Sequence, residues 1–228
     1  RKLTGGKRIK AVVGGLAGSF DRRKTTIVGG GSNIQGWVGR DLKKLFWKKL
    51  RAPIFLENDA ALAGLAEAVR GAGKGKEIVA YITVGTGVGG ARIVNGAIDA
   101  NAMGFEPAYQ IIDADGTMIP GHRRLGRYIS GAALEERYGK APAEIKDPAI
   151  QEKLSLWLAI GLNNMIVHWS PDVVVLGGPV MNIIPIKRVR FHLQKTLKSF
   201  MQPPPVKGAL LGDTGGLYGA LVYLKSRL

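Results

Sequence analysis

The sequence predicts an α/β fold, in which apolar strands alternate with helices. Residues 54–56 and 78–84 are apolar runs of strand length, and the alanine-rich segment 60–69 between them has high helix propensity. A third apolar run, 173–176, follows the long segment 148–168, in which leucines recur at helical spacing. Strands separated by helices in this way are typical of α/β proteins.

The composition limits the classes of protein to consider. With 228 residues, of which 46 % are hydrophobic, the chain can bury a core and form one or two domains. No apolar run is long enough for a transmembrane helix, and the basic N-terminus lacks the apolar core of a signal peptide. These features predict a cytoplasmic protein with no membrane partner. The absence of cysteine excludes disulfides and cysteine-ligated zinc.

The net charge of +16 is concentrated near the N-terminus, where only Asp21 and Asp41 oppose the basic residues of the first 51 positions. A basic field attracts nucleotides, sugar phosphates and nucleic acids alike. A solvated basic surface without any ligand is the simpler interpretation of the same residues. No aromatic residues alternate with the basic ones in an RNA-binding pattern, so we expect no specific nucleic-acid partner.

The first fifty residues are predicted to contain two strands and one helix. Residues 9–13 are expected to be a strand and residues 14–18 a turn. Residues 25–28 are a second β-prone run, followed by a glycine-rich loop over 29–37. Residues 41–50 place apolar side chains on one face and lysines on the other, which predicts an amphipathic helix.

Two features follow the central strands and suggest chemistry. Glu57-Asn58-Asp59 joins the first of these strands to the alanine-rich helix, and residues 85–90 form a glycine-rich turn after the second. Open α/β sheets place functional carboxylates at the carboxyl ends of strands. A Gly-Thr-Gly turn exposes N–H groups that suit phosphate oxygens. Together they suggest phosphoryl transfer, although Asn58 and Asp59 could be only a helix N-cap and the glycines only a tight turn.

The remaining chain continues the alternation of strands and helices. It is expected to contain a hairpin around Asn95-Gly96, a helix over 130–138, a Gly177-Gly178-Pro179 turn, a helix from about Asn182, a strand over 209–211 and a closing helix that begins in 212–216.

The motif Glu57-Asn58-Asp59-Ala60, followed by Ile82-Thr83-Val84-Gly85-Thr86-Gly87-Val88-Gly89-Gly90, resembles the ROK family of sugar kinases and sugar-responsive repressors. Gly15-Leu16-Ala17-Gly18-Ser19-Phe20-Asp21 and Ser32-Asn33-Ile34-Gln35-Gly36-Trp37 resemble two further motifs of this family. The resemblance covers nearly the whole chain from about Ala11 onward and is closest to glucokinase-like members. It implies an actin/hexokinase-like, ribonuclease H-like fold with two lobes around a cleft.

The resemblance also implies a division into lobes. Residues 1–56 are expected to form a partial N-terminal lobe, closed by the C-terminal helix 214–228, and residues 57–213 the C-terminal lobe. Family kinases begin with a strand and an Asp-x-Gly-Gly-Thr turn. Residues 4–11 resemble this turn only in part, because no Asp precedes the two glycines. The first lobe is therefore expected to lack its opening hairpins.

The resemblance implies a role for each of several residues. Asp59 would be the general base that accepts a proton from a sugar hydroxyl, while Asn33, Asn58 and Glu106 would hold the sugar. Gly85, Thr86 and Gly87 would bind the phosphates of ATP, which carries Mg²⁺, and Gly177 and Gly178 would flank the adenosine. A homodimer is compatible with this assignment.

The sequence departs from the family at the position of its zinc site. Tyr109 stands where many members have a zinc-binding His, Gly126 stands where a Glu is usual, and residues 118–127 contain none of the family's cysteines. We therefore expect no zinc, and we expect the isolated His122 to be a surface residue.

Two other classes remain open at this point. A non-catalytic sugar-binding or regulatory member would keep Asn33 and Glu106 but would not turn over ATP. A basic nucleic-acid-binding protein would explain the charge, although no helix-turn-helix segment precedes the kinase-like part.

Overall fold

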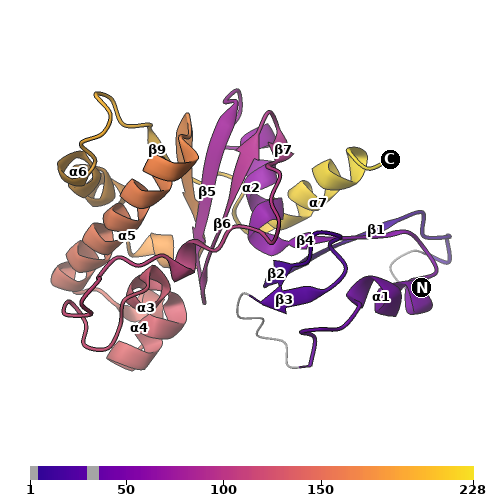
Figure 1. Ribbon diagram of the computed structural model, residues 1–228, viewed down its shortest axis with the longest axis horizontal. Helices are drawn as coiled ribbons and strands as arrows, with labels where there is room; N and C mark the ends of the chain where they lie inside the picture. The colour runs from indigo at the N-terminus through magenta and orange to yellow at the C-terminus, as the bar shows by residue number, and fades with distance from the viewer. Residues whose placement is uncertain (1–4, 30–35) are drawn as a thin grey trace.

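The strands form two groups in the computed structural model, which describes residues 5–29 and 36–228 (Figure 1). The first group comprises the parallel pair β1 (Val12–Leu16) and β4 (Ile54–Asn58), and the antiparallel pair β2 (Ser19–Phe20) and β3 (Ile27–Gly29). The second group is a five-stranded sheet in the order β7-β6-β5-β8-β9. Its strands are β5 (Ile78–Val84), β6 (Val88–Val94), β7 (Ala97–Ile98), β8 (Val173–Gly177) and β9 (Val206–Gly208).

Six helices of the described part of the chain cover the two faces of the five-stranded sheet (Figure 1). They are α2 (Asp59–Arg70), α3 (Leu125–Ile129), α4 (Gly131–Tyr138), α5 (Pro148–Trp169), α6 (Ile186–Thr196) and α7 (Gly215–Lys225). Helix α1 (Leu42–Leu50) packs instead against β4 in the first group of strands. Short 3₁₀ turns lie at Pro107–Tyr109, Pro142–Glu144, Pro179–Asn182 and Gly212–Thr214. Among the described residues, no helix has the length and apolar character needed to cross a membrane.

Strand β5 shows why the central apolar runs become buried strands. Ala80, Ile82 and Val84 pack into the core beneath α3 to α6, whereas Val79 and Tyr81 pack into the core beneath α2 and α7. Successive side chains point to opposite faces of a strand, so a strand covered on both faces is apolar throughout. The predicted strand at 78–84 is confirmed, and the strand predicted at 173–176 extends by one residue to Gly177.

The first strand lies three residues later than expected, and the prediction of a turn at 14–18 is wrong. Gly14 and Gly15 belong to β1, which pairs with β4 from Val12↔Ile54 to Leu16↔Asn58. A Cβ atom on Gly14 would lie 3.0 Å from Leu56 Cδ2, and one on Gly15 would lie 3.0 Å from Leu62 Cδ1. These glycines therefore allow close packing within a strand and do not form a turn.

Three further boundaries differ from the expectation. The glycine turn is shorter than residues 85–90, because β6 begins at Val88. Helix α6 begins at Ile186, after a 3₁₀ turn and Pro185, and not at Asn182. The last strand is Val206–Gly208, which pairs with Val174–Leu176, so the strand predicted at 209–211 is wrong.

Helix α7 connects the two groups of strands, because it packs against both α2 and β1. Gly215, Gly219 and Tyr223 are its buried residues, whereas Leu217 is 76 % exposed. The closing helix is therefore confirmed, and Gly219, not a leucine, lies against the backbone of α2 at Leu62.

Candidate active site

Asn58 and Asp59 lie where β4 ends and α2 begins, and their side chains have different roles. Asn58 is the N-cap: its Oδ1 accepts a hydrogen bond from the N–H of Ala61 at 3.1 Å, and its Nδ2 donates to the carbonyl oxygen of Gly18 at 3.2 Å. Asp59 is the first residue of α2 and is exposed, with Oδ1 accepting only the N–H of Ala60 at 2.8 Å among the described residues. The N-cap interpretation is confirmed for Asn58, and the carboxylate of Asp59 remains accessible.

Glu57, which precedes them, is a buried carboxylate that sequence reasoning did not select. It is 3 % exposed, and its Oε1 accepts hydrogen bonds from Lys24 Nζ and from the N–H of Asn58, each at 2.9 Å. Lys24 lies in the turn between β2 and β3 with a φ of 52°. The ion pair thus ties that turn to the segment that carries Asn58 and Asp59. Removing either partner would leave a poorly solvated charge, which is strongly destabilising.

Glu106 comes from a distant part of the chain and faces the same region. Its Oε1 accepts a hydrogen bond from Ser19 Oγ at 2.6 Å. Burial raises the pKa of Glu106, the bond from Ser19 opposes this shift, and the negative charge of Asp59 adds to it. Glu106 lines the same cavity as Asn58, the neighbour of Asp59.

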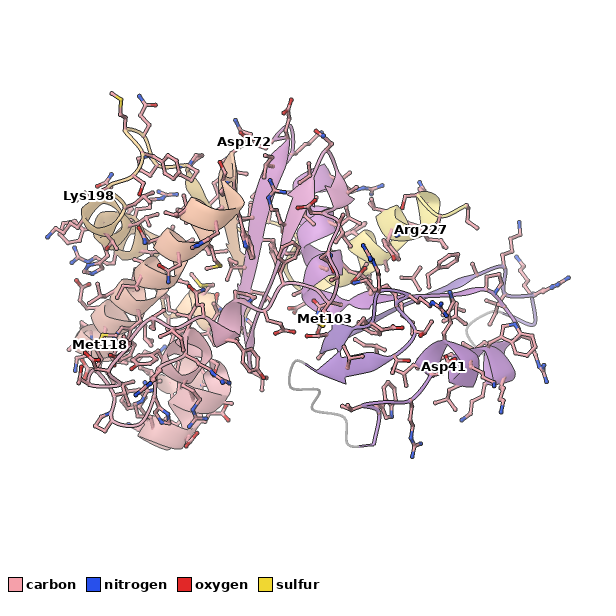
Figure 2. All side chains as sticks on the ribbon, in the orientation of Figure 1. Asp41, Met103, Met118, Asp172, Lys198 and Arg227 are labelled. Atoms are coloured by element: carbon pink, nitrogen blue, oxygen red, sulfur yellow. The ribbon has the colours of Figure 1, made fainter. Side chains whose placement is uncertain are left out.

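A narrow cavity separates Asn58 from Glu106. Its lining includes Gly18, Ser19, Lys24, Asn58 and Glu106, together with Met103, which Figure 2 marks where the two groups of strands meet. The cavity has a volume of about 10 Å³, which is room for about one water molecule. The cavity in this form is therefore too small for a sugar. The predicted sugar ligand Asn33 lies outside the described residues.

The glycine turn after β5 exposes hydrogen-bond donors. The carbonyl oxygens of Gly85 and Thr86 accept bonds from Gly131 N at 2.7 Å and Ala132 N at 3.2 Å, at the start of α4. Thr86 and Gly87 are exposed, and within the described part of the chain their N–H groups have no partner. Helix α4 thus holds the turn by donating hydrogen bonds to the carbonyl oxygens of the turn. The N–H donors of the turn remain available for an anion.

The second glycine turn lies directly against the first. Parallel pairing places Gly177 opposite Thr83, and the ring of Pro179 would lie 3.6 Å from a Cβ atom on Gly85. Gly178 has a φ of 91°, and a Cβ atom there would overlap the carbonyl oxygen of Val84. Only glycine allows this approach. The five residues assigned to the nucleotide are therefore grouped at one edge of the sheet.

The segment that differs from the family's zinc site is organised by a carboxylate. Asp113 accepts hydrogen bonds from Gly116 N at 3.0 Å and Met118 N at 2.8 Å, and the hydroxyl of Tyr128 lies 2.8 Å from its Oδ2. Burial, followed by the bond to Asp113, raises the pKa of Tyr128 to about 12. His122 is partly exposed on this loop. Within residues 5–29 and 36–228, no cluster of three or more His, Asp or Glu residues could hold a metal ion.

Tyr109 and Gly126 lie close together beside this loop. Tyr109 is 45 % exposed, and the guanidinium of Arg124 lies 5.0 Å from the centre of its ring. A Cβ atom on Gly126 would lie 3.1 Å from Ala108 Cβ, closer than side chains normally pack. A longer side chain at position 126, such as the Glu usual in the family, would therefore require Ala108 to move.

The family model for the ROK family matches residues 3–227 of this chain. The chain belongs to the ROK family. Among solved structures, the ROK hexokinase from Thermus thermophilus is similar, with a TM-score of 0.82 and 28 % identity over 99 % of this chain and 83 % of that one. The actin/hexokinase-like architecture expected from the sequence is thereby confirmed.

Several curated relatives of this ROK chain are named as sugar kinases. The N-acetyl-D-glucosamine kinase of Photobacterium profundum is 28 % identical over 90 % of this chain and 77 % of its own length. The fructokinase of Zymomonas mobilis is 30 % identical over 81 % of this chain and 66 % of its own. The named relatives act on different sugars, so the family alone does not specify one substrate.

Proposed function

We propose that this ROK protein transfers the γ-phosphoryl group of ATP to a hydroxyl group of a hexose or a related sugar. The observation that carries the proposal is the accessible carboxylate of Asp59 at the N-terminus of α2. Its neighbour Asn58 lines a cavity together with Glu106, and its other neighbour, Ala60, packs against Gly89, just beyond the glycine turn. Both a sugar and a phosphate group could therefore reach Asp59. Formation of ADP that depends on an added hexose tests the proposal.

In this mechanism Asp59 accepts the proton of the sugar hydroxyl as that oxygen attacks the γ-phosphorus. The bond between the γ-phosphorus and the bridging oxygen breaks, and ADP leaves. The transition state is loose, so most of the catalysis comes from positioning and from neutralising charge. The N–H groups of Thr86 and Gly87 would bind phosphate oxygens, and Gly177 and Gly178 would flank the adenosine. Mg²⁺ bound to ATP would neutralise phosphate charge.

The sugar would be held by Asn33, Asn58 and Glu106, between the lobe formed by residues 1–56 with 214–228 and the lobe formed by residues 57–213. The narrowness of the cavity and the Ser19–Glu106 hydrogen bond support a closed form without substrate. Sugar hydroxyls would replace Ser19 as the partner of Glu106.

We expect Glu106→Gln to weaken sugar binding about 10-fold, because a hydrogen bond to a charged group contributes about 1.5–3 kcal/mol. Isothermal titration with glucose and N-acetylglucosamine measures this effect, and Glu77→Gln, which changes an exposed carboxylate, is the matched control.

Binding of a neutral sugar should change little between about 50 and 200 mM salt, whereas non-specific nucleic-acid binding should fall steeply because counterions are released. Sequence-specific nucleic-acid binding at physiological salt, without sugar binding, would contradict the proposal.

We also expect the purified protein to contain no stoichiometric zinc, because it has no cysteine and Asp113 organises the loop instead. Elemental analysis after dialysis measures the metal content. About one zinc per chain would show that this expectation is wrong.

A non-catalytic, sugar-responsive protein is the second candidate function. Tyr109 and Gly126 support it. Tyr109 stands where many members of the family have a zinc-binding His, and Gly126 stands where a Glu is usual. Such a protein would bind sugar in the titration above but would form no ADP.

A further inference from the structure

A second cavity lies beside the candidate active site, at the junction of three segments that are distant in the sequence. These are the turn between β2 and β3, the residues after β7 and the carboxyl end of α7, where Figure 2 marks Arg227. The cavity has a volume of about 230 Å³. Three basic residues line it, namely Arg22, Lys24 and Arg227. It is smaller than the roughly 300 Å³ at which pockets for drug-sized ligands begin, so it suits a small molecule.

The charges facing this cavity are unbalanced. Its two carboxylates, Glu57 and Asp99, already have partners: Glu57 pairs with Lys24 at 2.9 Å, and Asp99 pairs with Arg92. Arg22 and Arg227 form no ion pair with a described carboxylate. The guanidinium of Arg227 instead lies 4.8 Å from the ring centre of Tyr223. Two arginines are thus available for an anion, and planar guanidinium groups bind phosphate oxygens in pairs.

Asn101 lines this cavity and has a polar atom that lacks a hydrogen-bond partner among the described residues. Its Nδ2 donates to the carbonyl oxygen of Asp99 at 2.8 Å, but its buried Oδ1 has no donor among the described residues. Asn101 also lines the narrow cavity of the candidate active site. A buried amide oxygen is normally hydrogen-bonded, so a donor such as a hydroxyl group would complete its environment.

We infer that this cavity binds a phosphorylated sugar, with the phosphate on Arg22 and Arg227 and a hydroxyl group on Asn101. The inference rests on the proposed function, since such a molecule belongs to the product class of a sugar kinase. The ligand's phosphate would also compete with Glu57 for Lys24. Glu57 directly precedes Asn58 and Asp59 in the chain. A ligand in this cavity would therefore affect the active site through Glu57 and Asn58, the last two residues of β4.

Isothermal titration of the full chain with glucose 6-phosphate tests this inference. Arg22→Gln combined with Arg227→Gln should weaken binding about 10–100-fold, because two charge-assisted contacts are lost. The matched control combines Arg23→Gln with Lys225→Gln, which removes the same charge from the same turn and helix but not from the cavity lining. The control should bind as the wild type does, and Glu106→Gln should not lose the binding of glucose 6-phosphate. Asn101→Ala should reduce the affinity for glucose 6-phosphate to that for inorganic phosphate.

Three results would overturn the inference. The first is no binding of glucose 6-phosphate up to about 10 mM. The second is equal affinity in the Arg22/Arg227 variant and its control. The third is a loss of binding in Glu106→Gln, which would assign the ligand to the active site. A chain that forms no ADP with any sugar, yet binds glucose 6-phosphate through Arg22 and Arg227, would contradict the proposed function and support this inference.

Discussion

Asp59→Asn is expected to lower the rate of sugar phosphorylation by about 10²–10⁴-fold, the usual contribution of a general base. The amide has almost the same shape as the carboxylate but does not accept a proton at neutral pH. Because Asp59 is exposed and Asn58 provides the N-cap, the free energy of unfolding should change little. Initial rates from a coupled ADP assay and urea unfolding curves measure the two effects.

Two further variants make this result specific. Asp115→Asn neutralises an exposed carboxylate away from the site and should retain wild-type turnover. Asn58→Ala removes the N-cap and should lower the free energy of unfolding by about 1 kcal/mol. If Asp59→Asn turned over sugar at the wild-type rate, Asp59 would not be the base. If Asp59→Asn unfolded more readily than Asn58→Ala, its main role would be in helix stability.

Gly219→Ala is expected to destabilise the protein by about 3 kcal/mol or more, at the upper end of the effect of overpacking. A Cβ atom on Gly219 would overlap the carbonyl oxygen of Leu62 and would lie 2.5 Å from its carbonyl carbon. Both atoms belong to the backbone of α2, so no side-chain rotation relieves the overlap. Helix α7 would have to move away from α2, and the contacts that connect the two groups of strands would weaken.

Gly216→Ala is the matched control for this prediction, since it lies in the same helix and a Cβ atom there would meet nothing within 4 Å. Because alanine is the better helix former, the control should be neutral or stabilising by about 0.5–1 kcal/mol. Urea unfolding of both variants measures the difference. Equal stability of Gly219→Ala and Gly216→Ala would show that α7 does not pack against α2 in this way.

The central strands and helices could be predicted because several local signals agree there. Residues 78–84 are apolar throughout and become a strand buried on both faces. Asn58 and the alanines after it predict a helix start, and α2 begins at Asp59. At these positions local preference and tertiary burial favour the same structure.

Two predicted turns were wrong or too long, because glycine occurs both in turns and where backbones pack closely. Gly14 and Gly15 read as a turn, but they lie in β1 against Leu56 and Leu62. Gly90 likewise lies in β6, where a Cβ atom would be 2.8 Å from the carbonyl oxygen of Tyr81. The sequence alone does not say which neighbour approaches a glycine.

The wrong position of the last strand has its cause in a distant side chain. Residues 209–211 are apolar enough for a strand, but the N–H groups of Leu210 and Leu211 donate to Glu67 Oε1 at 2.8 and 2.7 Å. Glu67 is 2 % exposed, and its Oε2 accepts the N–H of Ala72 at 2.8 Å. A buried carboxylate needs such donors, and it takes the N–H groups that would otherwise extend the sheet.

Only part of the candidate site has a local signal in the sequence. The pairing of Asn58 with the accessible Asp59, and the two glycine turns, could be selected because each follows a strand. The bonds Lys24–Glu57 and Ser19–Glu106 join residues 33 and 87 positions apart, and no local pattern indicates them. Both bonds form only in the folded protein, where the β2–β3 segment lies close to β4.

ATP turnover across a panel of sugars shows whether this ROK chain phosphorylates a sugar with Asp59 as the base, as we claim. Glucose, fructose, mannose, N-acetylglucosamine and N-acetylmannosamine would each be incubated with ATP and Mg²⁺, and both ADP and the sugar phosphate would be quantified. We expect at least one sugar to yield equal amounts of the two products, with a rate that Asp59→Asn lowers by about 10²-fold or more. Measurable sugar binding with no sugar phosphate from any member of the panel would contradict the claim.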